Sequence, residues 1–177
     1  MNIKQFLQNS VLPKNEARLL LQHITQLTHA QLLTHDEQIL SPKQLATLQE
    51  LETRRAAGEP MAYLLGYREF YGRRFRTTPA TLIPRPETEH LVEAVLSKMP
   101  SAARVWDLGT GSGAIAITLA CERADAQIFA SDISENALAV AQQNAADLGA
   151  KVSFHRGSWF DVQAKIAADA SFDIIVS

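Results

Sequence analysis

The segment VWDLGTGSGAIAI, residues 105–117, constrains the fold of this chain more than any other stretch of the sequence. An apolar, strand-like run leads into three alternating glycines, Gly109, Gly111 and Gly113, and a helix-forming run follows them. Glycines let such a loop turn sharply, and their missing side chains let a ligand approach the backbone closely. The segment therefore predicts a strand, a ligand-binding loop and a helix in direct succession.

The residues around this loop alternate between strand and helix patterns. The predicted order is strand 103–107, helix 113–122, strand 127–131, helix 134–148, strand 152–155 and strand 172–177. Such alternation is typical of an α/β fold in which a parallel sheet carries helices on both faces. Ligands of these sheets bind at the carboxyl ends of the strands, which is where the glycine loop lies.

The acid at the end of the first of these strands narrows the class of ligand. Asp107 directly precedes the loop, and its carboxylate would repel the pyrophosphate of a dinucleotide. It would suit a ligand that carries ammonium and sulfonium charges and no phosphate, as S-adenosylmethionine does. The glycine spacing is G-x-G-x-G, whereas dinucleotide enzymes use G-x-G-x-x-G. A dinucleotide-dependent oxidoreductase stays open as an alternative, because a glycine loop alone is weak evidence.

Two more candidate residues follow later strands. Asp132 ends the second strand about 20 residues after the glycine loop, where an acid commonly accepts hydrogen bonds from ribose hydroxyls. The alternative is that Asp132 caps the helix that begins near Ser134. Trp159, in GSWF after the third strand, could lie against an adenine ring or equally belong to the core.

The first part of the chain has helical spacing instead. Ser41-Pro42 is typical of a helix start, with an N-cap followed by proline at the first helical position. Three or four helices are expected, without a cluster of metal ligands or paired carboxylates. A docking or substrate-orienting role suits such a bundle. The predicted organisation is a helical domain over residues 1–60, an aromatic hairpin linker over 61–83 and an α/β domain over 84–177.

Charge and composition limit the partners. The chain has 17 Lys+Arg against 19 Asp+Glu and a formal net charge of -2, so no overall field attracts nucleic acid or an anionic membrane. Arg68, Arg73, Arg74 and Arg76 make the linker locally basic, which indicates a solvated turn or a contact with RNA or an acidic partner. A single cysteine, no signal-peptide pattern and no apolar run of membrane-spanning length predict a cytoplasmic protein without membrane or metal.

A longer segment carries a more specific signal than the glycine loop. GEPMAYLLGYREFYGRRFRTTPATLIPRPETEHLVE, residues 58–93, followed by DLGTGSGAIAI, GSWF and FDIIVS, resembles the release-factor glutamine methyltransferases. The likeness begins at NEARLLL and covers the chain in order. It implies transfer of a methyl group from S-adenosylmethionine to the glutamine of the Gly-Gly-Gln loop in peptide chain release factors. The implied fold is an N-terminal helical bundle plus an incomplete Rossmann-like class I S-adenosylmethionine methyltransferase domain.

The resemblance also assigns roles to residues. The cofactor-binding set would be Gly109, Thr110, Gly111, Ser112, Gly113, Asp132 and Trp159. The loop would line the methionine part, Asp132 the ribose and Trp159 the adenine side, while Asp107 would act through the amino group or a water. In the family an Asn-Pro-Pro-Tyr motif follows the fourth strand, and this sequence ends at Ser177, one residue before it. The catalytic residues are thus expected beyond Ser177, and residues 1–177 alone are expected to be an inactive truncated copy.

Two other functions stay open. An adenine-N6 nucleic-acid methyltransferase would share the cofactor loop, because an exocyclic amine poses the same chemical problem as an amide. The IPRPETE segment and the lack of net positive charge argue against it, so no direct nucleic-acid contact is expected. The other alternative is a non-catalytic module that docks a partner through its helices.

Overall fold

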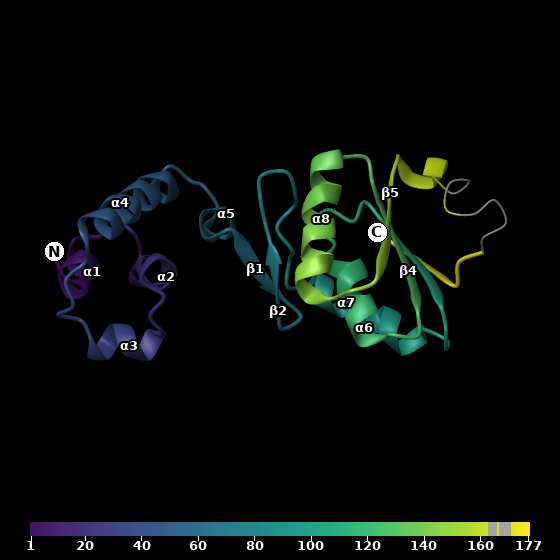
Figure 1. Ribbon diagram of the computed structural model, residues 1–177, viewed down its shortest axis with the longest axis horizontal. Helices are drawn as coiled ribbons and strands as arrows, with labels where there is room; N and C mark the ends of the chain where they lie inside the picture. Colours follow the sequence, from purple (N-terminus) through teal and green to yellow (C-terminus); the bar gives the residue numbers. More distant parts are fainter. Residues whose placement is uncertain (163–165, 167–170) are drawn as a thin grey trace. The chain divides into compact units, whose positions relative to one another are not determined.

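The structure is a computed structural model, and it describes residues 1–162, 166 and 171–177 (Figure 1). The chain divides into two compact units, Met1–Leu65 and Gly66–Ser177. The first unit is helical, and the second contains a hairpin and a parallel sheet. The structure thus assigns the hairpin to the second unit, whereas the sequence predicts it as a linker between two domains.

The helical unit begins its helices with strong local signals. Its helices are α1 (Ile3–Asn9), α2 (Lys14–Thr25), α3 (His29–Thr34), α4 (Pro42–Ala56) and α5 (Met61–Leu65). Helices α1, α3 and α4 each start with a capping box, in which the N-cap side chain and a glutamine three residues later satisfy each other's backbone N–H groups. The start of α4 at Ser41-Pro42 is as predicted. Leu20, Leu21 and Leu48 are completely buried at the centre of this unit.

The aromatic segment forms the predicted hairpin over part of its length, whereas its first residues form α5 and belong to the helical unit. Strand β1 (Tyr67–Phe70) pairs antiparallel with β2 (Arg73–Arg76). Tyr71 and Gly72 connect them with positive φ values of 50° and 69°, the pattern of a tight turn that matches the twist of a hairpin. Phe70 and Phe75 meet edge to face, with ring centroids 5.9 Å apart, and belong to the core of the second unit.

The sheet of the second unit is parallel and has four strands in the order β5-β4-β3-β6. The strands are β3 (Arg104–Leu108), β4 (Gln127–Asp132), β5 (Val152–Arg156) and β6 (Ile174–Val176), and the helices are α6 (Thr88–Lys98), α7 (Ala114–Glu122) and α8 (Glu135–Leu148). Each predicted strand and helix is present, with the last strand shorter than predicted. The α/β fold is therefore confirmed.

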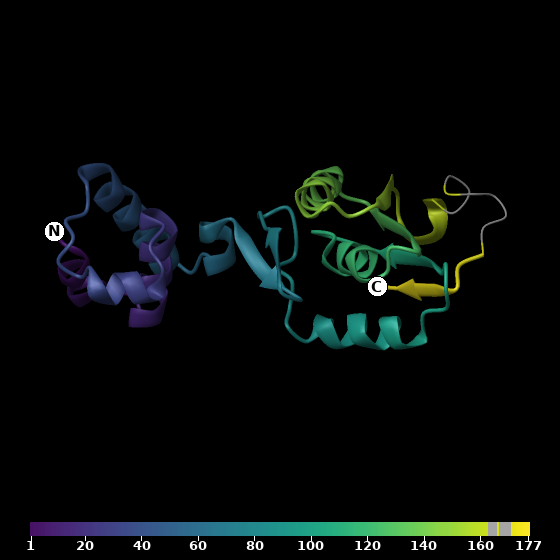
Figure 2. The same ribbon diagram turned by 60° about the horizontal axis from the view of Figure 1, so that its bottom comes forward.

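The helices of the described residues lie on both faces of the sheet, with the longer ones on one face. Side chains of α6, α7 and α8 share one core with the strands, so these helices pack on one face (Figure 2). On the opposite face, within the described residues, Trp106 and Leu108 pack against Val162 of the short helix η1 (Trp159–Val162). Right-handed crossovers explain this, because successive steps from β3 to β4 to β5 in one direction place both connecting helices on the same face.

The strand order changes direction at β3, which has β4 on one side and β6 on the other. Ligands of open α/β sheets bind outside the carboxyl ends of the strands at such a switch point. The glycine loop follows β3 directly, so the fold places it at this crevice.

No helix in the described part of the chain is both long enough and apolar enough to cross a membrane. Nor do three or more His, Cys, Asp or Glu side chains of the described residues gather where they could hold a metal ion.

Candidate functional site

The glycine loop turns between β3 and α7 through left-handed backbone conformations. Gly109, Gly111 and Gly113 have φ values of 72°, 56° and 82°, a region that other residues rarely adopt. Its first residues are fastened to the neighbouring strand, because the N–H groups of Gly109 and Thr110 donate to the Ser131 carbonyl at 2.9 and 3.0 Å. The loop is thus held at the carboxyl ends of β3 and β4.

The glycines of the loop serve different needs. A Cβ atom at Gly109 or Gly111 would meet no atom within 4 Å, so these positions border open space. A Cβ at Gly113 would lie 2.5 Å from Ile117 Cδ1 and 3.2 Å from Ala141 Cβ. Gly109 and Gly111 therefore leave room for a ligand, while Gly113 lets α7 and α8 pack closely.

Asp107 is buried behind the loop and organises it. Its Oδ2 accepts hydrogen bonds from Thr110 Oγ1 at 2.6 Å and from the Ala116 N–H at 3.3 Å. Burial raises the pKa of Asp107 from 3.8 to about 6, with a further rise from the Asp132 carboxylate, against the lowering effect of these two hydrogen bonds. Asp107 thus joins the loop to the first turn of α7.

The raised pKa of Asp107 predicts a pH-dependent cost in stability. Below about pH 3 the carboxyl is mostly protonated in both folded and unfolded chains, and above about pH 6 it is mostly ionised and buried in the folded chain. We expect Asp107→Asn to unfold at the same urea concentration as the unchanged chain at about pH 3. At pH 7 the variant should be more stable by up to about 3 kcal/mol, since one pKa unit corresponds to about 1.4 kcal/mol. An equal difference at both pH values would contradict this assignment.

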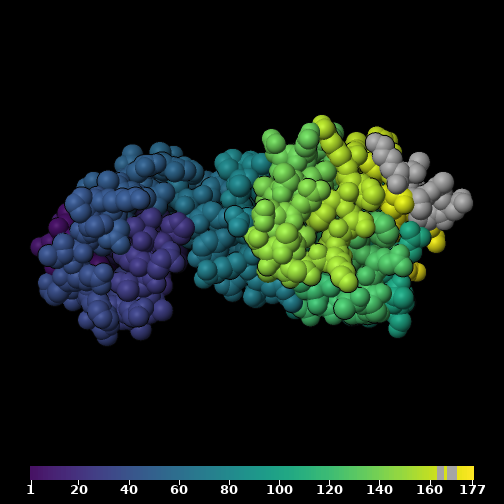
Figure 3. Space-filling view, in the orientation of Figure 1, coloured from purple at the N-terminus to yellow at the C-terminus, as the bar shows by residue number. Residues whose placement is uncertain are grey.

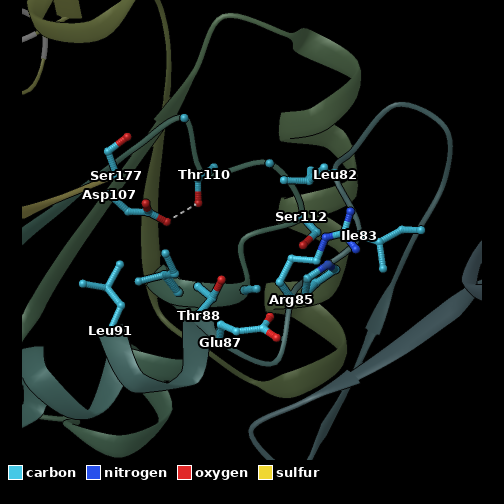
Figure 4. A pocket seen from close by; sticks show the side chains of 15 residues that line it. Leu82, Ile83, Arg85, Glu87, Thr88, Leu91, Asp107, Thr110, Ser112 and Ser177 are labelled. Carbon is cyan, nitrogen blue, oxygen red and sulfur yellow. Dashed lines mark hydrogen bonds between the residues drawn. The ribbon is translucent and has the colours of Figure 1, made fainter.

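A cavity of about 390 Å³ opens beside the loop (Figure 4). Asp107, Thr110 and Ser112 line one side of it, and the segment Leu82–Leu91 lines the other. The side chains of Arg85, Glu87 and Thr88 belong to that second wall. The sequence marks this segment as the specific part of the family resemblance, and the structure brings it against the glycine loop.

Arg85, Glu87, Thr88 and Leu91 are missing from the residues predicted for the site. The available signal was the proline-rich segment LIPRPETE, which places a base and an acid just before α6. Its proximity to the glycine loop follows from the packing of α6 beside α7, which the spacing of residues cannot reveal.

A second cavity, of about 260 Å³, lies at the ends of β4 and β5. Asp132, Gly157 and Trp159 line it, and it shares Gly109 and Ser177 with the first cavity. The two cavities therefore adjoin at the glycine loop. A ligand that spans both would extend from the loop toward Trp159.

Asp132 binds backbone groups on both of its oxygens. Oδ2 accepts from the Gly111 N–H and Oδ1 from the Ser134 N–H, each at 2.9 Å. The N-cap of α8 is Ser134, whose side chain accepts from the Ala137 N–H, so the alternative that Asp132 is this cap is wrong. Each carboxylate oxygen can accept a further hydrogen bond from a ligand.

Trp159 lies at the surface, with 63% of its area exposed, and belongs to the wall of the second cavity. The alternative that it is a core residue is therefore wrong. Gly113 is the one predicted cofactor residue that lines neither described cavity. The others divide between the first cavity and the second.

Family models match most of this chain. Residues 2–66 match the PrmC N-terminal domain, and residues 100–177 match a methyltransferase domain. The release factor glutamine methyltransferase of Neisseria gonorrhoeae is 55% identical over 177 residues, which are 100% of this chain and 64% of that protein. The enzyme of the same name from Bordetella pertussis is 46% identical. That match covers 99% of this chain and 64% of the Bordetella protein. The chain thus spans less than two thirds of these relatives.

Solved structures support the same fold. The Pyrococcus abyssi tRNA (uracil-54, C5)-methyltransferase in complex with S-adenosyl-L-homocysteine matches with a TM-score of 0.50 and 17% identity, over 63% of this chain and 26% of that one. A SAM-dependent methyltransferase from Agrobacterium tumefaciens matches with a TM-score of 0.50 and 19% identity, over 62% of this chain and 38% of that one. At these identities the likeness shows the fold alone, which is Rossmann-like.

Proposed function

Because this chain is related over its whole length to the release factor glutamine methyltransferases, we propose that it holds S-adenosylmethionine in the two adjoining cavities at the glycine loop. We further propose that the whole protein methylates the glutamine of the Gly-Gly-Gln loop in release factors, in the cytoplasm where they act. The observation that carries the cofactor assignment is the pairing of an open glycine loop with two acids, Asp107 and Asp132.

The side chains of both cavities suit the methionine part, the ribose and the adenine of this cofactor. The carboxylate of Asp107 would attract the ammonium group of the methionine part, and open space at Gly109 and Gly111 leaves room for its chain. Asp132 has unused acceptor capacity for the ribose hydroxyls, and the exposed ring of Trp159 can cover adenine. When bound, the cofactor supplies a methyl group on a positively charged sulfur.

The acceptor in the proposed reaction is a weak nucleophile. The lone pair of an amide nitrogen is delocalised into the C–N bond, so the site has to hold the nitrogen in line with the methyl group. Acceptors that take hydrogen bonds from both N–H groups of the amide would provide this alignment. By the family's order these acceptors belong to the Asn-Pro-Pro-Tyr motif, and Ser177, which would precede it, lines both cavities.

Two measurements test the proposed function. We expect titration calorimetry to detect binding of S-adenosylhomocysteine to residues 1–177. We expect the same chain to transfer no tritiated methyl group to a release factor, while the Neisseria gonorrhoeae relative, as the control, transfers it. A chain that fails to bind S-adenosylhomocysteine would contradict the cofactor site. Transfer at a rate similar to that of the relative would contradict the assignment of the acceptors to the motif after Ser177.

A further arm of the assay tests the alternative substrate. DNA and RNA replace the release factor, and the longer relative remains the enzyme source. Methylation of adenine in either polymer, with none of the release factor, would favour the adenine-N6 function. Because that relative is a release factor glutamine methyltransferase, we expect no transfer to either polymer.

A further inference from the structure

One buried amide side chain on α8 has no role in the site described so far. Asn144 is 1% exposed, although α8 otherwise turns small apolar residues such as Ala141 and Ala145 toward the core. In the space-filling view, α8 lies at the surface of the molecule beside β5 (Figure 3). Asn144 belongs to the buried side of this helix. A buried amide is costly unless its donors and acceptor are bonded.

Asn144 satisfies its hydrogen bonds with two segments that are far apart in sequence. Its Oδ1 accepts from the Arg76 N–H at 2.7 Å, and its Nδ2 donates to the Arg76 carbonyl at 3.2 Å. The same Nδ2 donates to the Ser112 carbonyl at 2.8 Å. One side chain therefore connects the last residue of the hairpin to the glycine loop.

Two basic residues of the hairpin form ion pairs with α7 and α8. Arg73 pairs with Glu122 of α7 at 2.7 Å, and Arg76 Nε pairs with Asp147 of α8 at 2.6 Å. Arg74 lies over the Tyr67 ring, 4.7 Å from its centroid. Exposed ion pairs of this kind contribute only about 0–1 kcal/mol each. The hydrogen bonds of Asn144 are less exposed than these ion pairs, and they add to the packing of Phe70 and Phe75 in the core.

The glycine loop has anchors on both sides of Gly111. Asp132 at the end of β4 accepts from the Gly111 N–H, and Asn144 donates to the carbonyl of the next residue, Ser112. Together they bind the peptide group before Gly111 and the peptide group after Ser112, in the wall of the first cavity. The same amide group of Asn144 also binds the hairpin backbone at Arg76.

We propose that Asn144 is a positioning residue for cofactor binding, which uses the docked hairpin to set the conformation of the glycine loop. This inference rests on the proposed function, because the loop is taken to receive the cofactor. Loss of Asn144 should loosen the loop and the hairpin together. The cofactor should in turn stabilise the hairpin, since coupling between two sites is reciprocal.

The test uses Asn144→Asp and a matched control, Asp147→Ala. An aspartate keeps the acceptor for the Arg76 N–H, but it has no donor for the carbonyls of Arg76 and Ser112 and places a negative oxygen against both. The control removes a partner of the Arg76 side chain from the same helix and leaves the loop contact intact. Hydrogen exchange without ligand is measured first, and titration with S-adenosylhomocysteine follows.

We expect Asn144→Asp to speed amide exchange in residues 109–114 while β3 and β4 stay protected. It should also weaken S-adenosylhomocysteine binding about tenfold, which loss of the hydrogen bond to the Ser112 carbonyl can account for. Asp147→Ala should leave both quantities unchanged. In the unchanged chain, S-adenosylhomocysteine should slow exchange of the Arg76 amide, a measurement that needs no variant.

Unchanged loop exchange in Asn144→Asp would overturn the inference, as would exchange that rises uniformly across the sheet, because a merely structural residue would loosen the whole domain. If Asn144→Asp fails to fold, the inference is decided by whether S-adenosylhomocysteine slows exchange of the Arg76 amide in the unchanged chain. If the unchanged chain does not bind S-adenosylhomocysteine, the proposed function fails, and the ligand-free exchange still decides whether Asn144 holds the loop.

Discussion

Valine in place of Gly111 is expected to abolish detectable binding of S-adenosylhomocysteine, with an affinity loss of more than about 100-fold. The position borders open space, so the branched side chain fits the protein but occupies the first cavity. The φ value of 56° adds backbone strain of about 1–2 kcal/mol for a residue with a Cβ atom. Titration calorimetry measures the affinity, and circular dichroism with thermal unfolding measures the fold.

Gly149→Val is the matched control for this variant. Gly149 ends α8 with a φ value of 66°, and a Cβ there would also meet no atom within 4 Å. It lines neither cavity, so the control carries similar backbone strain without obstructing a ligand. We expect both variants to lose similar stability and only Gly111→Val to lose binding. Binding of Gly111→Val within threefold of the unchanged chain would show that the loop does not receive the cofactor.

Replacement of Asp132 with alanine is expected to weaken S-adenosylhomocysteine binding by at least about 100-fold. Two hydrogen bonds from ribose hydroxyls to the carboxylate would be lost, each worth roughly 1.5–3 kcal/mol. The change also frees the Gly111 N–H, so the loop loses one of its anchors. Calorimetry with the unchanged chain and with Asp132→Ala gives the difference directly.

Two controls, the variant Glu135→Ala and the ligand adenosine, distinguish loss of the ribose hydrogen bonds from loss of the anchor on the Gly111 N–H. Glu135 is the next acid along the chain, pairs with Arg156 at the surface and lines neither cavity, so its loss should leave the affinity unchanged. Adenosine carries the ribose but has no methionine part to contact the loop. If Asp132→Ala binds adenosine as well as the unchanged chain does, Asp132 supports the loop and does not bind the ribose.

Much of the architecture was predictable because its causes lie within a few residues. Alternating apolar runs indicate strands and helices, and the capping box at Ser41 marks the start of α4. The glycine loop and the acid at the end of β4 are likewise visible as spacing along one strand–loop–helix unit. Strand order is also partly predictable, since consecutive parallel strands with right-handed crossovers lie side by side.

The environment of each acid could not be predicted in this way. The resemblance places Asp107 near the cofactor's amino group or a water, which stays a prediction. The structure adds that Asp107 lies in the wall of the first cavity, bound to Thr110 and Ala116, with a raised pKa. Burial depends on what the whole chain packs around a carboxyl. The sequence names the ionisable group, but the surrounding density of protein sets its pKa.

The sequence by itself determined the types of element, the glycine loop and the position of Asp132, because propensity and hydrophobic periodicity act over one or two turns of chain. Only the tertiary structure decided that the segment around Arg85 faces the loop, and that Asn144 joins Arg76 to Ser112. These contacts link residues that are distant in the chain. Their formation depends on how helices stack on a twisted sheet, and no local pattern of residues encodes which polar groups then meet.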